Sequence, residues 1–230
     1  MSGPGPSSED PNLKSLYPFL HGERQDPLAM RAALLESVKQ KAESHRAVFD
    51  DFFARHADQV VAVSESIAAV YQRDGKILCM GNGGSSCDAG HIAVEFLHPV
   101  TAGRPALAAV DLTSDRAMLS AVGNDIGFSH VFVRQVIAHG RAGDALIGMS
   151  TSGNSKNLVS AFIKAKELGL TTIGFAGMSG GEMQRIGLDH CIVVDTDSIH
   201  RIQECHVAIY HIIWDLVHTL LADRRGSCSG

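Results

Sequence analysis

The sequence predicts an α/β fold in which a parallel five-stranded sheet is flanked by helices on both faces. Five short apolar runs recur along the chain, and each is followed by a turn rich in Gly, Ser, Asp or Asn and then by a helical stretch. Strands that alternate with helices in this way form parallel sheets covered on both sides. The runs span residues 76–80, 106–112, 145–149, 171–176 and 191–194. A chain of 230 residues, 45% of them hydrophobic, can fill the core of one such domain.

Other segments frame this repeating pattern. Residues 1–25 mix Pro, Gly, Ser and charge with little periodicity, so we expect a flexible arm there and a flexible tail at residues 224–230. Residues 26–223 are predicted to form a single domain. Its first part, to about residue 71, has apolar residues at helical spacing, which predicts two helices broken near His56 that serve packing or oligomerisation. A long final helix is expected from residue 199 to about residue 223.

Charge and cysteine content restrict the class of protein. The formal net charge is −5 and no run of Lys or Arg occurs, which argues against a nucleic-acid partner. The five cysteines are an odd number without CxxC spacing, which indicates reduced thiols. The N-terminus lacks the features of a secretory signal, and no later stretch is expected to be apolar enough to span a bilayer. We therefore expect a cytoplasmic protein with no membrane partner.

The turn after the first expected strand is rich in glycine. It reads Gly-Asn-Gly-Gly-Ser-Ser from Gly81 to Ser86. Glycines let backbone N–H groups approach an anion at the positive N-terminal end of the following helix. The same pattern occurs in turns that bind nothing, and it lacks both the Walker lysine and the full GxGxxG spacing. By itself, the turn is an open candidate for an anion site.

A second turn carries four hydroxyl groups. It reads Ser-Thr-Ser-Gly-Asn-Ser from Ser150 to Ser155 and precedes a helical stretch at residues 157–168. Hydroxyl and amide groups at a helix N-terminus can donate hydrogen bonds to a phosphate dianion without any lysine. One hydroxyl would be enough to cap the helix. Because four within six residues exceed that need, we predict that the turn binds phosphate.

Three motifs resemble those of the bacterial phosphoheptose isomerases, a family of SIS-domain proteins. They are GNGGS at residues 81–85, VGNDIGF at 122–128 and GMSTSGNS at 148–155, and the likeness runs from about residue 75 to residue 221. The resemblance implies a SIS-type, flavodoxin-like doubly wound fold. It also implies two sets of substrate-binding residues: the phosphate would be held by Ser150, Thr151, Ser152 and Ser155, and the sugar would be lined by Asn82, Gly83, Gly84, Ser85, Asn124 and Asp125.

The helix after the glycine-rich turn carries a possible metal-binding pair. His91 and Glu95 are four residues apart, so they lie on one helix face. An imidazole and a carboxylate at this spacing can bind one divalent ion, although a surface hydrogen-bonded pair has the same spacing. The resemblance adds Gln203 and His211 from the last helix. It implies one Zn²⁺ per subunit, held by these four residues, and a contact between Gln203 and the substrate.

Gln203 and His211 raise a geometric question. Eight residues separate them, so on a straight helix their Cα atoms lie ~12 Å apart along the axis. Gln203 could lie in a non-helical lead-in, the two could come from different subunits, or they could be linked to the metal only through the substrate. The sequence leaves these alternatives open.

The resemblance implies an intramolecular oxidoreductase. Its expected reaction interconverts sedoheptulose 7-phosphate and D-glycero-D-manno-heptose 7-phosphate through an enediol, for synthesis of lipopolysaccharide heptose precursors. This reaction needs a base, an acid and an electrophile. We expect Glu95 to take the carbon-bound proton and His211 to handle protons at the oxygens or the other carbon. Since metal binding lowers carboxylate basicity, Glu95 would exchange between the roles of ligand and base.

Other functions are weighed against this one. Some SIS-domain relatives are tetrameric regulators of the replication initiator that have lost the catalytic pair, whereas this chain has both Glu95 and His211. Sugar-phosphate-sensing modules usually accompany a second domain, and none fits here. An isomerase of another ketose phosphate is a further alternative. The resemblance also implies a homotetramer with sites at subunit interfaces and a small-molecule sugar phosphate as partner.

The sequence departs from the family pattern at two places. Many relatives carry an arginine a few residues after the glutamate, where this chain reads Leu-His-Pro at residues 97–99, although Arg104-Pro105 falls in the expected place. His200 stands where some relatives have an aspartate. The resemblance therefore assigns no substrate contact to residues 97–99 and no carboxylate role to position 200.

Overall fold

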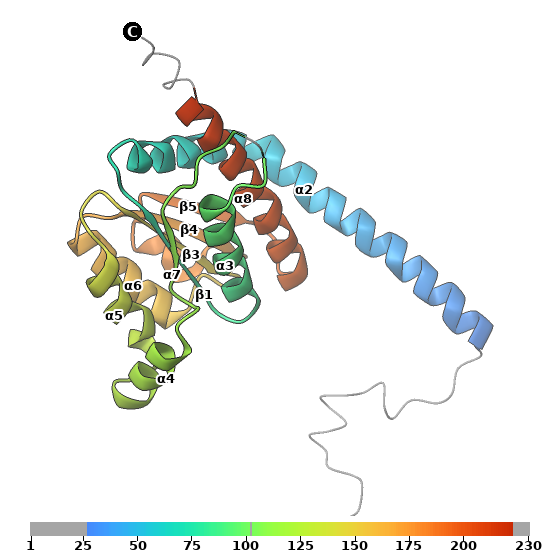
Figure 1. Ribbon diagram of the computed structural model, residues 1–230. Coiled ribbons are helices and arrows are strands. Elements are labelled where there is room, and N and C mark those ends of the chain that lie inside the picture. The colour runs from blue at the N-terminus through green and yellow to red at the C-terminus, as the bar shows by residue number, and fades with distance from the viewer. Residues whose placement is uncertain (1–26, 102, 223–230) are drawn as a thin grey trace, which may run out of the picture. The chain divides into compact units, whose positions relative to one another are not determined.

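The computed structural model describes residues 27–101 and 103–222 of the protein. The chain divides into two compact units, residues 1–43 and residues 44–230, and all described strands lie in the second unit. The predicted arm at residues 1–25 and tail at residues 224–230 lie outside the described residues. In chain order the elements are α2 (Pro27–Tyr71), β1 (Ile77–Gly81), α3 (Gly84–Leu97), β2 (Ala109–Asp111), α4 (Arg116–Asp125), η2 (Phe128–His130), α5 (Val131–His139), β3 (Ala145–Ser150), α6 (Lys156–Glu167), β4 (Thr171–Gly177), α7 (Gly181–Arg185), β5 (His190–Val194) and α8 (Ile199–Ala222) (Figure 1).

The five strands form one parallel sheet in the order β2-β1-β3-β4-β5. The predicted parallel five-stranded sheet is thus confirmed. β1 and β3 lie side by side with Ile77 opposite Ala145 and Gly81 opposite Met149. β2 is shorter than its predicted range because only three of its residues pair with β1. Since all strands run in one direction, the loops that follow β1 and β3 lie at the same edge of the sheet.

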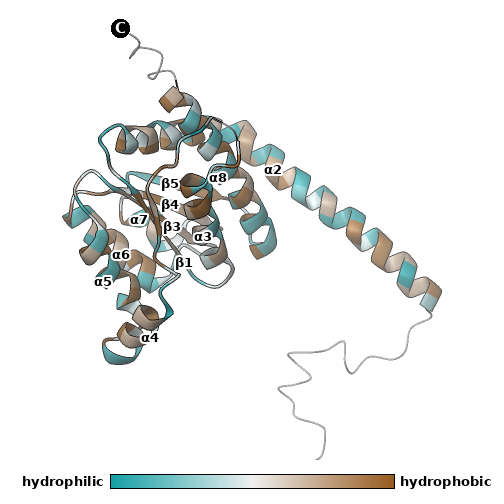
Figure 2. Ribbon diagram, in the orientation of Figure 1, coloured by the Kyte–Doolittle hydropathy of each residue, from teal (hydrophilic) through white to brown (hydrophobic). Residues whose placement is uncertain are grey.

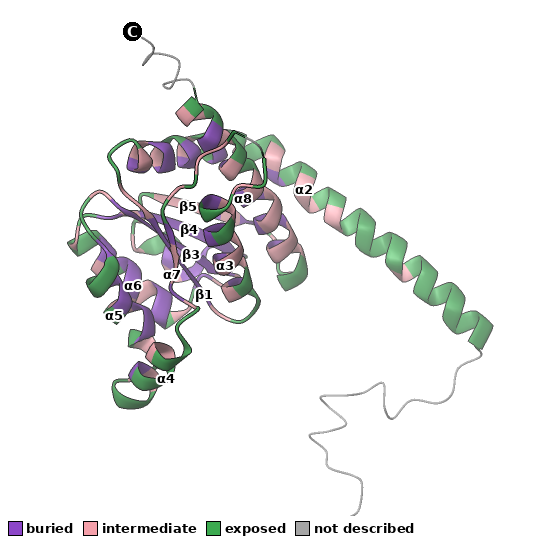
Figure 3. Ribbon diagram, viewed as in Figure 1, coloured by how far each residue is buried: buried purple, intermediate pink, exposed green. Residues whose placement is uncertain are grey.

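Helix α3, helix α8 and the part of α2 from residue 44 onward pack on one face of the sheet. Phe96 of α3 and Ile209 of α8 belong to one buried apolar cluster with Ile147 and Phe175 of the strands. In Figure 3 the strands are drawn mostly as buried, whereas α3 and α8 carry both buried and more exposed residues. This shared face brings side chains of α3 and α8 together.

Helices α4, α5, α6 and α7 cover the opposite face. Phe132 of α5 and Phe162 of α6 pack with Leu78, Met80 and Leu146 in a second buried cluster. Successive strand residues point to opposite faces of a sheet, so both sides of a strand must be apolar when both faces are covered. All five residues of β1 are buried accordingly. The prediction of helices on both faces is confirmed.

The predicted break near His56 is wrong. Helix α2 runs through this position without interruption, and the His56 ring packs against Phe52 one turn earlier, with ring centroids 5.2 Å apart. No Pro or Gly occurs between residues 28 and 71, so nothing in the segment breaks the backbone hydrogen bonds of the helix. The apolar positions shift gradually around the axis of this long helix, so their spacing looks interrupted near His56 although the chain does not turn there. The predicted helical pair is therefore one helix.

Helix α8 is more apolar than expected. Of the helices in residues 27–101 and 103–222, it alone has the length and composition of a membrane span, which corrects the expectation that no stretch would qualify. Its residues Ile202, Ile209 and Ile213 are buried against the sheet. Hydrophobic and hydrophilic residues both occur along it in Figure 2. Packing of one side in the domain core accounts for its apolar composition.

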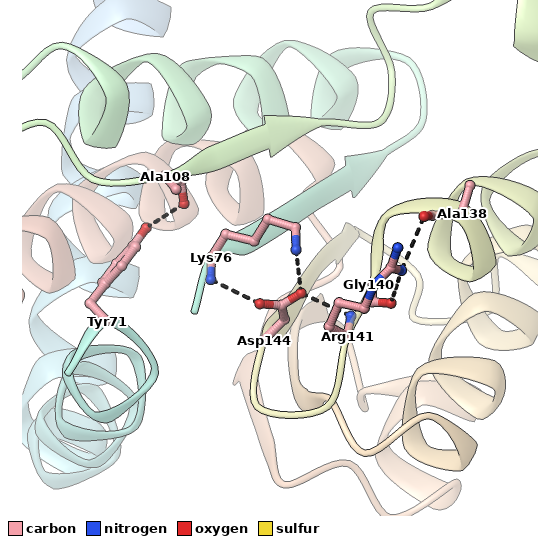
Figure 4. A network of polar contacts seen from close by, with 7 residues as sticks. All are labelled: Tyr71, Lys76, Ala108, Ala138, Gly140, Arg141 and Asp144. Atoms are coloured by element: carbon pink, nitrogen blue, oxygen red, sulfur yellow. Dashed lines mark hydrogen bonds and ion pairs between the residues drawn. The ribbon is translucent and has the colours of Figure 1, made fainter. Parts of the chain in front are cut away.

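Asp144 links the starts of β1 and β3 at the edge opposite the loops. Its side chain is 5% exposed and accepts hydrogen bonds from the backbone N–H of Lys76 at 3.0 Å and of Arg141 at 2.9 Å. It also pairs with Lys76 Nζ at 2.6 Å (Figure 4). The carboxylate therefore satisfies two backbone donors and one ammonium group.

Replacing Asp144 with alanine is expected to lower the free energy of unfolding by about 2 kcal/mol or more, because two backbone donors and the Lys76 ammonium lose their acceptor. Urea unfolding followed by circular dichroism measures the change. Asp51→Ala serves as control, since Asp51 pairs with Arg55 on an exposed helix face where an ion pair adds little. Equal effects of the two substitutions would contradict a structural role for the Asp144 network.

Candidate active site

His91, Glu95 and His211 form a cluster between α3 and α8. One ligand atom from each lies within 4.8 Å of the other two. The Nε2 atom of His91 is 3.3 Å from Oε1 of Glu95, and the His91 and His211 ring centroids are 5.0 Å apart. The i, i+4 spacing places the first two on one face of α3, and the packing of α8 on the same sheet face supplies the third. The structure thus brings together three of the four predicted metal ligands.

Two aromatic residues of α8 support this cluster. The Tyr210 hydroxyl lies 2.8 Å from Nδ1 of His91, and the Trp214 indole N–H donates a 2.8 Å hydrogen bond to the backbone carbonyl of Glu95. Neither residue was singled out from the sequence. Their apolar rings fit the helix pattern, and only the three-dimensional contact with α3 reveals their polar role.

The charge state of His211 suits both ligation and proton transfer. Burial, together with the neighbouring His91, lowers the pKa of His211, and the nearby Glu95 carboxylate opposes this shift. A lowered pKa leaves the imidazole neutral at neutral pH, with a lone pair that can accept a proton or bind a metal. On the same side of α3, burial raises the pKa of Asp88, against the opposing effect of His91.

The chemistry of these side chains fits a divalent transition-metal ion. Two imidazole nitrogens and one carboxylate oxygen are a donor set typical of catalytic sites that keep a coordination position open for water or substrate. The separations among the three ligand atoms are close enough for small side-chain movements to bring them onto one ion. His91 and Glu95 are partly exposed, so the cluster is accessible to a small molecule.

Gln203 lies in α8, so a non-helical lead-in is excluded as the explanation of its spacing from His211. Its amide nitrogen sits beside Gly84: a Cβ atom at position 84 would lie only 2.4 Å from it. Gly84 is seven residues before His91 on α3, ~10 Å along the helix axis. Gln203 therefore faces the glycine-rich turn, and its role as a metal ligand stays a prediction.

The glycine-rich turn joins β1 to α3. Gly83, with a φ of 55°, precedes the first residue of the helix, and no side chain of the described residues caps it. The Asn82 amide forms two reciprocal 2.9 Å hydrogen bonds with the amide of Asn157 on α6. Ser85 is 4% exposed and lies in the first turn of α3. The exposed backbone of Gly83 and Gly84 is thus the accessible part of this turn.

The serine-rich turn joins β3 to α6. The hydroxyl groups of Ser150 and Ser155 are 2.9 Å apart, and Ser152 Oγ accepts a hydrogen bond from the backbone N–H of Asn154 at 3.2 Å. Gly153 has a φ of 66°, and a Cβ there would lie 2.0 Å from the Gly180 carbonyl, so only glycine fits. Within the described residues, no side chain caps the N-terminus of α6. The N–H groups of Leu158 and Val159 bond to the Ser155 carbonyl, and the start of the helix lies directly after the hydroxyl-rich turn.

The two turns are adjacent because β1 and β3 are neighbours, and the Asn82–Asn157 amide pair connects them. Asn157 is 3% exposed and was missed in the sequence, where it looked like an ordinary residue of the helix first turn. Asn124 and Asp125 lie elsewhere, exposed at the end of α4, and their side chains bond to each other at 2.9 Å. No hydrogen bond within residues 27–101 and 103–222 connects this pair to either turn, so their contact with sugar stays a prediction.

Comparison with known families identifies the domain. Residues 42–177, which include both turns and the His91–Glu95 pair, match the SIS domain family. The chain belongs to the SIS-domain family.

Relatives of this SIS-domain protein are isomerases. The phosphoheptose isomerase of Sulfurimonas denitrificans is 42% identical over 188 residues, which cover 82% of this chain and 95% of the relative. That of Aquifex aeolicus is 40% identical over 191 residues, covering 83% and 100% of the two chains. The structure of the phosphoheptose isomerase from Neisseria gonorrhoeae has a TM-score of 0.77 and 37% identity, and covers 81% of this chain and 99% of its own. The protein is accordingly an isomerase.

Arg104 of this SIS-domain isomerase lies in the loop between α3 and β2 and packs against α8. Its guanidinium is 4.3 Å from the centre of the Trp214 ring and pairs with Asp215 at 2.5 Å. These contacts hold the loop between α3 and β2 against the helix that carries His211. In this structure Arg104 therefore packs on the protein one turn beyond the cluster.

Proposed function

We propose that this SIS-domain isomerase interconverts sedoheptulose 7-phosphate and D-glycero-D-manno-heptose 7-phosphate, in the cytoplasm, to supply heptose precursors. The observation that carries the proposal is the cluster of His91, Glu95 and His211 at a site reached by a small molecule. The names of the relatives support the substrate class, since phosphoheptose isomerases align with more than four-fifths of the chain.

The phosphate group of the substrate binds at the serine-rich turn. Ser150, Thr151, Ser152 and Ser155 offer four hydroxyl donors, and the uncapped N-terminus of α6 adds backbone N–H groups and a positive electrostatic end. The Ser150–Ser155 hydroxyl pair can redirect its protons toward a phosphate oxygen without moving the backbone. The sugar then extends along the glycine-rich turn, where Gln203 faces Gly84.

Glu95 moves the proton between the two carbons. In the ketose, C2 carries the carbonyl; Glu95 removes a proton from C1, the C1–H electrons form the C1=C2 bond, and the C2 oxygen gains a proton to give an enediol. The O1 proton then leaves, C1 becomes the carbonyl, and C2 receives a proton to give the aldose. His211, neutral because its pKa is lowered, accepts and returns protons at the two oxygens.

The metal proposed for the cluster is one zinc ion per subunit, held by His91, Glu95 and His211, with Gln203 as the fourth ligand. When bound, the ion supplies positive charge that polarises the substrate carbonyl. Within one chain, Gln203 faces Gly84 and not the cluster. The fourth ligand would therefore be Gln203 of a neighbouring subunit, or Gln203 of the same chain linked through the substrate or brought in by a rearrangement. Glu95 and His211 would serve in proton transfer only while outside the ligand set, because a metal-bound carboxylate is less basic and a metal-bound imidazole nitrogen has no free lone pair.

Incubation of the purified protein with sedoheptulose 7-phosphate, followed by NMR, tests the function. A rising aldose C1–H signal supports the proposal, and in D₂O solvent deuterium enters at C2. Turnover of a different ketose phosphate alone would identify a SIS isomerase with another substrate. Absence of turnover for every ketose phosphate, with tight binding retained, would instead indicate a regulatory binding protein.

The serine-rich turn is expected to act mainly in binding. Ser152→Ala and Ser155→Ala each remove a hydroxyl donor to the phosphate and weaken binding by about 1 kcal/mol or more, a rise in KM of roughly fivefold with a smaller change in kcat. Steady-state kinetics checks this. Ser120→Ala is the control, because its hydroxyl bonds within α4. Unchanged KM in both variants would move the phosphate elsewhere.

The protein is expected to form a homotetramer with sites at subunit interfaces. Both units of the chain expose large apolar side chains, which an assembly would cover. They include Leu28, Leu34, Leu35 and Val38 of the first unit and Val61, Val94, Leu97 and Ile212 of the second. Sedimentation velocity at micromolar concentration should give the mass of four 24.5 kDa chains. A monomer under these conditions would contradict this expectation.

A further inference from the structure

Tyr210 stands out among the buried polar groups near the cluster. It precedes His211 on α8, is 3% exposed, and places its hydroxyl 2.8 Å from His91 Nδ1. Its ring packs edge-on against both histidines, with centroids 5.4 Å from His91 and 4.8 Å from His211. The Tyr210 ring therefore contacts both histidines of the proposed metal site, and its hydroxyl oxygen lies within hydrogen-bond distance of His91 Nδ1 only.

The two nitrogens of His91 face different partners. Nε2 lies on the side of Glu95, 3.3 Å from Oε1, and Nδ1 faces Tyr210. A neutral imidazole carries a proton on one nitrogen and a lone pair on the other, and the hydrogen bond at one nitrogen fixes the role of the other. If Nδ1 carries the proton, Nε2 presents its lone pair to the space shared by the three ligand atoms.

A tyrosine hydroxyl can both donate and accept a hydrogen bond. Without metal, it can donate to Nδ1 while Nε2–H points at the Glu95 carboxylate. With metal on Nε2, it can accept from Nδ1–H. The same contact therefore holds the His91 ring in both states.

We propose that Tyr210 is a positioning residue that orients His91 and, on metal binding, accepts its Nδ1–H so that Nε2 is the ligand atom. This inference rests on the proposed metal site. Hydrogen-bond partners of ligand histidines fix ring orientation and strengthen binding, and their loss typically weakens metal affinity 10–100-fold. The other polar contacts beside the cluster do not reach a ligand side chain: Trp214 bonds to the backbone of Glu95, and Arg104 pairs with Asp215. The Tyr210 hydroxyl, in contrast, contacts the ring of His91 directly.

Zinc affinity of Tyr210→Phe tests the proposal. The substitution removes one oxygen and keeps the ring packing on both histidines. Competition with a chromogenic chelator at fixed pH should show zinc binding about 10–100-fold weaker than wild type. Tyr71→Phe is the matched control: it also removes a tyrosine hydroxyl, which bonds at 3.2 Å to the Ala108 carbonyl (Figure 4). The Tyr71 ring packs on Phe96 and would be kept. Equal zinc affinity of Tyr210→Phe and wild type would overturn the inference.

NMR of the unmodified protein gives a second test that needs no variant. In the zinc-loaded protein, ¹⁵N spectra of the histidine rings should show His91 with a slowly exchanging proton on Nδ1 and metal on Nε2. Metal on Nδ1, or a freely exchanging Nδ1 proton, would overturn the assignment. The outcomes separate the two levels of inference: a wild type that binds no zinc removes the proposed metal itself, whereas zinc binding that is indifferent to Tyr210 removes only its positioning role.

Discussion

Glu95→Gln is expected to abolish most isomerisation while sugar phosphate still binds. Glutamine has nearly the same volume and can still offer an oxygen to a metal, but it cannot accept a proton from carbon. General base catalysis is typically worth 10²–10⁴-fold, so kcat should fall by at least about 100-fold. KM should change only a few-fold, because the proposed phosphate contacts lie on the serine-rich turn after β3.

Measurement of kcat and of C2 deuterium incorporation in D₂O reports the lost proton transfer, and retained sugar-phosphate binding distinguishes it from a lost fold. Zinc content should be similar to wild type, since an amide oxygen replaces the carboxylate oxygen. Glu167→Gln is a suitable control, because Glu167 is an exposed residue at the end of α6 that pairs with Lys164. A Glu95→Gln protein that isomerises at the wild-type rate would end the assignment of Glu95 as the base.

The sheet was predictable from sequence because its physical signal is local. Each of the five strands is an apolar run that ends at a turn, and β1, with all five residues buried, shows why both sides of such a strand are apolar. The continuity of α2 and the length of β2 were less predictable. A continuous helix can look interrupted in the sequence where its apolar row drifts around the axis, as in α2. The length of β2 is set by its pairing with Ile77–Cys79.

The site was predictable in its local parts and not in its contacts between elements. The i, i+4 pair of His91 and Glu95 and the row of hydroxyls at Ser150–Ser155 are visible in one segment each. The meeting of His211 with this pair depends on the packing of α3 and α8 on one sheet face, and it followed only from the family resemblance. The same reason hid Tyr210 and Asn157, whose partners lie 119 and 75 residues away.

The burial of Asn157 could not be predicted from its local sequence. A polar residue in the first turn of a helix usually faces water, and its sequence context gives no other sign. Here it pairs with Asn82 and connects the serine-rich turn to the glycine-rich turn. The relative position of the two turns thus depends on a pair of amides, and under the proposed function this pair would set the distance between the phosphate and the reacting carbons.

His91→Ala is expected to act through the metal, so zinc content and turnover should fall together. Removal of one of three clustered ligands weakens binding of the ion, and the loss of ligand contacts also loosens the Glu95 side chain that His91 Nε2 contacts at 3.3 Å. After dialysis, bound zinc measured by mass spectrometry should drop by at least about tenfold. Excess zinc should restore part of the activity, because a weaker site can still be filled by mass action.

The histidine at the end of the same helix provides the control. His98 is exposed at the C-terminus of α3 and lies outside the cluster, so His98→Ala should leave zinc content and turnover unchanged. The comparison also distinguishes His91 from Glu95: loss of the base removes turnover at full zinc occupancy, whereas loss of the ligand removes both and responds to added zinc. A His91→Ala protein with full zinc and full activity would show that the metal, if present, binds elsewhere in the chain.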